Sequence, residues 1–268
     1  MSSSGQVDRL SRPPTAGQLR LYRACRVVAV GLSRLLFPGR VVGAERLPDG
    51  PFILAPVHRS YVDWLLVARL TRRRLRYIVK AEVWKSKQVG RLIEALGAFP
   101  VNRSGADREA LERCRAVLEG GEPLVMFPEG TRRSGPVVED LREGVSYLAL
   151  RAGVPIVPVG IGGSERAMPR GSAIPRPRRV DLVVGEPIWP PATEPPADSG
   201  ESSADGGDAE QPGTGETAGT VAAAPRRARV SRRAMKELSD QLARAIQEVF
   251  DEAERQLLET TISGRPRS

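Results

Sequence analysis

The sequence contains a single histidine, His58, and an acidic residue, Asp63, follows it five positions later. Histidine titrates near neutral pH, so it can take a proton from an attacking hydroxyl group, and a nearby carboxylate can fix its tautomer. On a regular helix, two residues five positions apart lie about 140° from each other. The two side chains can therefore meet only if His58 sits in the turn before a helix that carries Asp63. The pattern alone is a weak signal, because a lone histidine is more often structural.

A second polar segment, FPEGTR at residues 127–132, follows a short apolar run. Arg132 suits an anion, Gly130 allows a close backbone approach, and Thr131 adds a hydroxyl to the same polar rim. Glu129 can either orient an alcohol or hold an arginine. The alternative interpretation is a surface turn with a local ion pair.

Two further segments have the composition of site walls. GAFPVNR at residues 97–103 is a short apolar strand that ends in Arg103, whose guanidinium could bind a phosphate through two hydrogen bonds. VPIVPV at residues 154–159 is an apolar strand interrupted by prolines. Proline cannot donate to a strand ladder, so this strand is predicted at an edge of the sheet or in an irregular wall.

The elements that must position these residues alternate along the chain between residues 41 and 184. Short β-rich runs are separated by helical patterns, which predicts an α/β fold with a mixed, largely parallel sheet flanked by helices. In such a fold, loops at the strand ends carry the reactive groups. The predicted strands are residues 52–55, 75–79, 123–126, 155–159 and 180–184, and the predicted helices are residues 17–37, 61–70, 89–96, 108–118 and 144–152.

Charge is distributed unevenly along the chain. The formal net charge is +9, yet residues 192–225 contain seven acidic residues and no basic one. The part before them is therefore strongly cationic, which predicts an anionic partner. The acidic segment is rich in Pro, Gly and Ser and is predicted to be disordered. The predicted division is a flexible N-terminus at 1–15, an amphipathic membrane-docking helix at 16–40, the α/β domain at 41–190, a disordered acidic linker at 191–229, and a C-terminal helix and tail at 230–268.

Cysteine usage and hydropathy indicate the compartment. Cys25 and Cys114 form neither a disulfide framework nor a metal-binding pattern, which favours a reducing cytosol. No stretch approaches the ~18–20 apolar residues of a membrane span, and the N-terminus lacks the order of a signal peptide. We therefore expect a peripheral protein at the cytoplasmic face of a membrane.

Two basic segments are candidates for membrane contact. The helix predicted at residues 17–37 combines arginines with a wide apolar face and could lie in a lipid interface, or it could pack on the core with a solvated arginine stripe. A second run could be attracted to anionic lipid or could be ordinary surface charge. Its members are Arg72, Arg73, Arg74, Arg76, Lys80, Lys85, Lys87 and Arg91.

The four segments, in this order, resemble the four blocks of the glycerolipid acyltransferase superfamily, and specifically its 1-acylglycerol-3-phosphate acyltransferases. Residues 58–63 match the His-x4-Asp block, and residues 97–103 match the Gly-x-x-φ-x-x-Arg block, where φ is an apolar residue. Residues 127–132 reproduce the Phe-Pro-Glu-Gly-Thr-Arg block in full, and residues 154–159 fit the Val-Pro-φ-φ-Pro-Val block. The resemblance runs from about residue 41 to residue 187. This sequence has Val57 where the family usually has Asn before the histidine, and a second arginine, Arg133, before Ser134.

The resemblance implies a direct acyl transfer. In the family, the histidine deprotonates the acceptor hydroxyl, which attacks the thioester of acyl-CoA or acyl-carrier protein without an acyl-enzyme, a metal or a bound cofactor. Carried over, His58 is the base and Asp63 orients it. The acceptor would be lysophosphatidic acid (1-acylglycerol-3-phosphate), acylated at its sn-2 hydroxyl to give phosphatidic acid. The residues that would bind its phosphate and glycerol are Arg103, Glu129, Gly130, Thr131 and Arg132, and residues 154–159 would help to form the acyl-binding wall.

Two other functions fit part of the sequence. A related acyltransferase that acts on glycerol-3-phosphate or on another lysophospholipid would carry the same blocks. A nucleic-acid-binding module would explain the basic charge, but aromatic residues make up only 4% of the chain and no stacking platform or groove-reading motif is present. We therefore expect no nucleic-acid partner.

Overall fold

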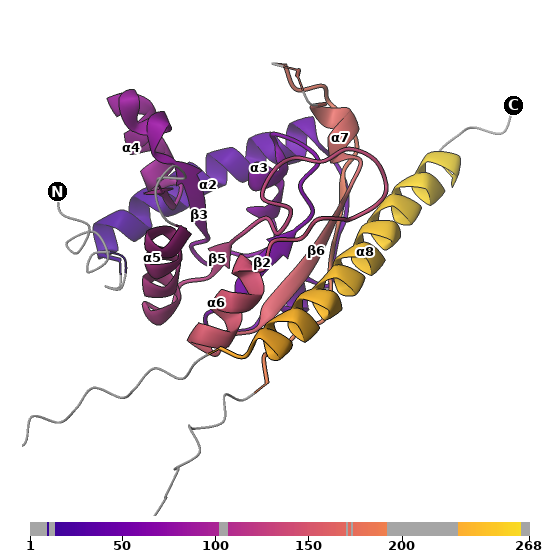
Figure 1. The fold of residues 1–268 in the computed structure, drawn as a ribbon. Helices are drawn as coiled ribbons and strands as arrows, with labels where there is room; N and C mark the ends of the chain where they lie inside the picture. The colour runs from indigo at the N-terminus through magenta and orange to yellow at the C-terminus, as the bar shows by residue number, and fades with distance from the viewer. Residues whose placement is uncertain are drawn as a thin grey trace, which may run out of the picture.

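The computed structural model describes residue 10 and residues 14–101, 107–169, 171–172, 174–191 and 230–263. Within these residues, seven strands form one sheet in the order β1-β7-β6-β2-β5-β3-β4 (Figure 1). Paired strands are parallel except β6 and β7, which are antiparallel. The predicted mixed, largely parallel sheet is therefore confirmed. The strands are β1 (Val41–Val42), β2 (Ile53–Pro56), β3 (Arg76–Lys80), β4 (Ala98–Val101), β5 (Leu124–Val125), β6 (Ile156–Gly162) and β7 (Asp181–Val184).

Helices cover both faces of the sheet. Helices α5, α6 and α8 contact one another in that order across one face, and α2 lies on the other side with α3 and α4 against it (Figure 1). The predicted linker at 191–229, apart from Pro191, lies outside the described residues, as does most of the predicted flexible N-terminus. The helices are α2 (Ala16–Leu36), α3 (Asp63–Val67), α4 (Lys87–Ala95), α5 (Asp107–Glu119), α6 (Gly144–Ala152), α7 (Ser164–Ala167) and α8 (Arg232–Ser263), with 3-10 turns η1 (Ala44–Arg46) and η2 (Ala81–Lys85).

Helix α2 is fixed at both ends by side-chain hydrogen bonds. At its start, the Thr15 side chain accepts from the Gln18 N–H and the Gln18 side chain accepts from the Thr15 N–H, which forms a capping box. At its end, the guanidinium of Arg69 donates to the carbonyls of Phe37 and Gly39. Burial lowers the pKa of Arg69. The C-terminal end of α2 is thus tied to the residues that follow α3.

Strand β6 lies between β7 and β2, so the prediction that it would be at an edge or in an irregular wall is wrong. Its prolines are tolerated because of where they fall. Pro155 precedes the strand, and the ladder between β6 and β7 covers only the stretch from Val159 to Gly162. Beyond it, the Gly185 N–H donates to the Pro158 carbonyl, so no strand residue there requires the hydrogen that Pro158 lacks.

Helix α8 crosses β6 at very short range. Gly160 and Gly162 face it, and a Cβ added at either position would overlap the α8 backbone, at the carbonyl of Val249 or of Ala253. The whole of β6 is buried. Two glycines on one strand face therefore let the helix backbone rest directly on the sheet.

We expect Gly160→Ala to reduce the free energy of unfolding by about 1–3 kcal/mol or more, because the added methyl has no space beneath α8. The control is Gly31→Ala on α2, where an added Cβ meets nothing within 4 Å. Alanine is the better helix former, so that change should stabilise by about 0.5–1 kcal/mol. Urea unfolding measures both. Equal stability of Gly160→Ala and the wild type would contradict the close approach.

Candidate active site

His58 and Asp63 meet as the sequence requires. Strand β2 is fully buried and ends at Pro56, so His58 lies in the turn that precedes α3, and Asp63 is the first residue of α3. His58 Nδ1 lies 3.0 Å from Asp63 Oδ2. Because a carboxylate oxygen can only accept, Nδ1 carries the hydrogen and Nε2 keeps its lone pair. The pair is therefore arranged for His58 to accept a proton at Nε2.

The carboxylate of Asp63 is itself fixed by the turn. Its Oδ2 accepts from the backbone N–H of Arg59 at 2.8 Å and of Ser60 at 2.7 Å, in addition to the imidazole. Asp63 is completely buried, whereas the His58 side chain is 21% exposed. The imidazole also stacks on the ring of Phe127, with the centroids 4.0 Å apart. One orientation of the base is thus held by a hydrogen bond and a ring contact.

Glu129, from the FPEGTR segment, lies behind the histidine. Its Oε2 accepts from the backbone N–H of His58 at 2.8 Å, and its Oε1 pairs with the guanidinium of Arg59. Both charged side chains are 1% exposed. Of the two roles that the sequence left open for Glu129, the structure shows that it holds an arginine, and both of its oxygens are occupied in doing so.

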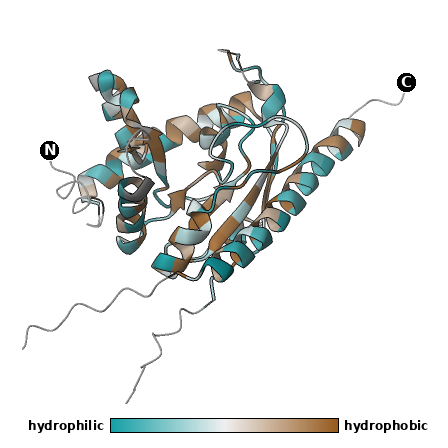
Figure 2. Ribbon diagram, viewed as in Figure 1, coloured by the Kyte–Doolittle hydropathy of each residue, from teal (hydrophilic) through white to brown (hydrophobic). Residues whose placement is uncertain are grey.

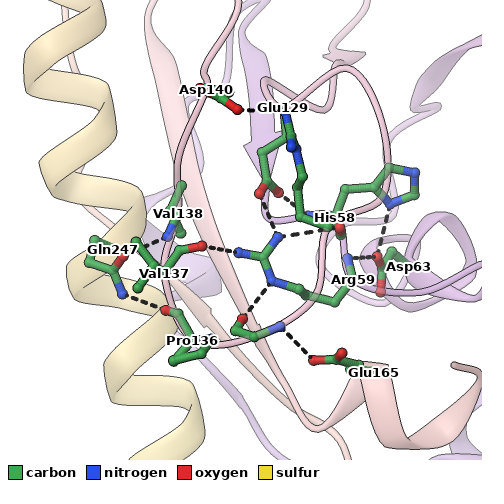
Figure 3. A network of polar contacts seen from close by, with 12 residues as sticks. His58, Arg59, Asp63, Glu129, Pro136, Val137, Val138, Asp140, Glu165 and Gln247 are labelled. Atoms are coloured by element: carbon green, nitrogen blue, oxygen red, sulfur yellow. Dashed lines mark hydrogen bonds and ion pairs between the residues drawn. The ribbon is translucent and has the colours of Figure 1, made fainter. Parts of the chain in front are cut away.

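Arg59 is a buried residue of the candidate site that the sequence did not reveal. Its guanidinium lies in the centre of a polar network (Figure 3). Nε donates to the Gly135 carbonyl at 3.1 Å and Nη2 donates to the Val137 carbonyl at 2.9 Å. Arg59 therefore joins the His58 turn to the loop after the FPEGTR segment. Its position within the His-x4-Asp block was visible, but nothing in the spacing indicated a buried arginine.

Arg132 is placed differently from Arg59. Its Cζ lies 3.2 Å from the centroid of the Tyr61 ring, which is partly exposed, and its Nη1 has no hydrogen-bond partner among the described residues. Thr131 is exposed beside it. Gly130 has a φ of 65°, and a Cβ there would overlap the side chain of Arg142. The Gly130 turn thus makes room for an arginine of the same loop.

Two of the predicted segments contribute less to the described site. Arg103 lies outside the described residues. Residues 154–159 form part of the buried centre of the sheet and are covered by α8, so they present no surface to an acyl chain.

Burial raises the pKa of the Cys114 thiol to about 12, so this thiol is no nucleophile at neutral pH.

Three arginines of the predicted membrane-binding basic run are used internally. Arg73 donates to the carbonyls of Pro48, Gly50 and Gly121. Arg74 and Arg76 pair with Glu122 at 3.4 Å and 3.0 Å, and burial lowers the pKa of Arg76 to about 10. These three side chains therefore have structural partners within the fold, and their attraction to anionic lipid stays a prediction.

Comparison with known proteins agrees with this geometry. A family model described as Acyltransferase matches residues 39–162. The 1-acyl-sn-glycerol-3-phosphate acyltransferase of Bacillus subtilis (strain 168) is 27% identical over 170 residues, which cover 63% of this chain and 82% of that protein. The matched region, residues 39–162, belongs to the acyltransferase family. A 1-acyl-sn-glycerol-3-phosphate acyltransferase of Chlamydomonas reinhardtii is 31% identical over 157 residues, but the match spans only 46% of that protein and 56% of this chain.

A solved structure supports the same fold. The crystal structure of the 1-acyl-sn-glycerophosphate (LPA) acyltransferase PlsC from Thermotoga maritima aligns with a TM-score of 0.58 and 22% identity, and covers 93% of this chain and 81% of that one. The family model and the curated relatives confirm the resemblance to the 1-acylglycerol-3-phosphate acyltransferases that the four sequence blocks indicated. The chain is an acyltransferase enzyme.

We expect Glu129→Gln to reduce the free energy of unfolding by about 3–5 kcal/mol, because it leaves the buried Arg59 guanidinium without a counter-charge. The matched control is Glu186→Gln, which removes the carboxylate from an exposed pair with Arg46 and should cost less than about 1 kcal/mol. Chemical denaturation with circular dichroism compares the two. Similar losses in both variants would mean that the Arg59–Glu129 pair has no special role in stability.

Proposed function

We propose that this acyltransferase moves a fatty acyl group from acyl-CoA or acyl-carrier protein to the sn-2 hydroxyl of 1-acylglycerol-3-phosphate, giving phosphatidic acid. The observation that carries the proposal is the His58–Asp63 pair, whose 3.0 Å contact directs the free Nε2 of a half-buried imidazole away from the carboxylate. The names of the relatives supply the acceptor. No metal or bound cofactor takes part in the proposed reaction.

The proposed mechanism is direct attack. Nε2 of His58 takes the proton as the acceptor oxygen bonds to the thioester carbonyl carbon. The tetrahedral intermediate then expels the thiolate, which takes the proton back from the imidazole. Asp63 stabilises the imidazolium between the two steps through its hydrogen bond to Nδ1. The proton is thus returned and the enzyme ends each cycle unchanged.

We assign the acceptor phosphate to the neighbourhood of Arg132. Its guanidinium has no carboxylate partner among the residues described here. Its Nη1 is buried and unpaired, so an anion would reach it only when the side chain turns away from the Tyr61 ring. Arginine suits phosphate because it can donate two parallel hydrogen bonds. Thr131 is exposed next to it, and Arg103 remains a proposed second phosphate ligand. Glu129 acts on the substrate only indirectly, by fixing the His58 backbone.

The test is acyl transfer by purified protein from radiolabelled acyl-CoA to a panel of acceptors. We expect labelled phosphatidic acid from 1-acylglycerol-3-phosphate, and less product from glycerol-3-phosphate or lysophosphatidylcholine. His58→Ala should lower turnover by at least about 10²–10⁴-fold at unchanged folding, since base catalysis is lost and the sequence holds no second histidine. Preferred use of glycerol-3-phosphate would favour the related acyltransferase function. Turnover of folded His58→Ala within about tenfold of wild type would exclude His58 as the base.

The proposed enzyme works at a membrane surface, because its acceptor and product are lipids. Helix α2 packs on the core through Tyr22 and Val30, yet its opposite side exposes Val28 and Leu35 at 72% and 77%. Hydrophobic and charged residues alternate along it (Figure 2). No described helix is long and apolar enough to cross a bilayer. This apolar side is bordered by three exposed arginines, which are Arg20, Arg23 and Arg34.

We expect the double variant Val28→Asp with Leu35→Asp to bind anionic liposomes at least about tenfold more weakly, because each loses apolar burial in the lipid interface. Binding of the wild type should also weaken with salt. The control pair is Leu258→Asp with Ile262→Asp, which are 57% and 73% exposed on α8. Liposome sedimentation is the measurement. Equal loss in both pairs would show that α2 has no privileged contact with lipid.

A further inference from the structure

Helix α8 lies outside the matched range of residues 39–162, yet it contacts the loop beside the catalytic histidine. The contact is made by Gln247. Its Oε1 accepts from the Val138 N–H at 2.8 Å, and its Nε2 donates to the Pro136 carbonyl at 3.0 Å. A single amide side chain therefore satisfies one donor and one acceptor of the same loop, as a partner strand would do (Figure 3).

That loop is the part of the chain that holds Arg59. The carbonyls of Gly135 and Val137, which alternate with the two groups bound by Gln247, accept from Nε and Nη2 of Arg59. The Gly135 N–H is bound in turn by Glu165 at 3.2 Å. Gln247 fixes the loop from one side and Arg59 binds it from the other, so the position of the guanidinium depends on the position of α8.

Helix α8 also touches the guanidinium itself. The ring of Phe250, one helical turn after Gln247, lies with its centroid 5.1 Å from Cζ of Arg59 and is itself buried. An aromatic face attracts a guanidinium at this range. Arg59 then pairs with Glu129, whose other oxygen accepts from the His58 backbone N–H. Each link from Gln247 to the backbone of the base is thus a contact between described residues.

We propose that Gln247, with Phe250, is a positioning residue for catalysis: α8 holds the 135–138 loop and, through Arg59 and Glu129, sets the place of the His58 turn. This inference rests on the proposed function of His58 as the base. Neither residue touches the reacting atoms. Their effect should therefore fall on kcat rather than on KM, because a displaced base still allows both substrates to bind.

The experiment compares Gln247→Met with Gln241→Met. Methionine keeps the unbranched shape and helix preference of glutamine but removes both hydrogen-bonding groups. Gln241 is exposed on the same helix, so its variant should behave as wild type. We expect Gln247→Met to lower kcat about 10- to 100-fold, with the KM values of donor and acceptor within about twofold of wild type, since small displacements of a catalytic group have effects of this size.

A second measurement does not require turnover. Protein labelled with ¹⁵N-histidine and made without a histidine tag gives one imidazole signal set, because His58 is the single histidine of the sequence. We expect its ring resonances to shift or broaden in Gln247→Met and to stay unchanged in Gln241→Met. Phe250→Leu, which keeps apolar packing and both Gln247 hydrogen bonds, should perturb them in the same direction. It replaces Gln247→Met in both assays if that variant does not fold.

The outcomes separate the two proposals. If the wild type transfers no acyl group, the proposed function is contradicted. The imidazole signals would still report whether α8 positions His58. An active wild type, with kcat and imidazole signals unchanged in folded Gln247→Met, would overturn the positioning role. Equal effects of Gln247→Met and Gln241→Met would overturn it too, because the loss would then come from α8 in general.

Discussion

The buried pair of Arg59 and Glu129 is the interaction on which the rest of the site depends. Two opposite charges that are 1% exposed are stable only if nearly every polar atom has a partner. The partners come from four places: the His58 backbone, the Gly135 and Val137 carbonyls, and the Phe250 ring. Satisfying one ion pair therefore fixes the turn with the base, the loop beyond the FPEGTR segment, and the C-terminal helix relative to one another.

The arginines of this protein differ in the partners that they have within the fold. Arg59, Arg69 and Arg76 are buried and donate to carbonyls and carboxylates of the fold, although Nε of Arg69 and Nε of Arg76 have no partner among the described residues. Arg132 lies against the Tyr61 ring and has no carboxylate partner among the described residues. A net charge of +9 therefore says little about which cations meet an anionic ligand. The hydrogen-bond and ion-pair partners of each arginine decide which of them can meet such a ligand.

Much of the fold was predictable because strand and helix patterns are local. The alternation of β-rich and helical runs gave the α/β class, and the turn that brings His58 to Asp63 followed from their spacing and from the strand before them. The position of β6 was not predictable in this way. Whether Pro158 disrupts a sheet depends on where β7 stops, and that is a property of a segment more than twenty residues away.

The site was predictable to a similar degree. The errors in its prediction have a similar cause, because they concern partners that are distant in the sequence. The motif residues predicted a base and an anion site. Glu129 was assigned to substrate binding because the sequence does not show which residue it pairs with. That partner, Arg59, is unremarkable in sequence and distinguished only by burial. Gln247 had no signal at all, since a glutamine on an amphipathic helix is ordinarily solvent-exposed.

The two glycines on β6 have a consequence for the order in which the molecule can be completed. Domains generally form from the N-terminus onward during synthesis, and all four sequence blocks precede α8 by at least seventy residues. Until residues 232–263 have emerged, the groove above Gly160 and Gly162 stays open and one side of a wholly buried strand faces water. A nascent chain that already displays every recognisable motif is thus still missing part of its core.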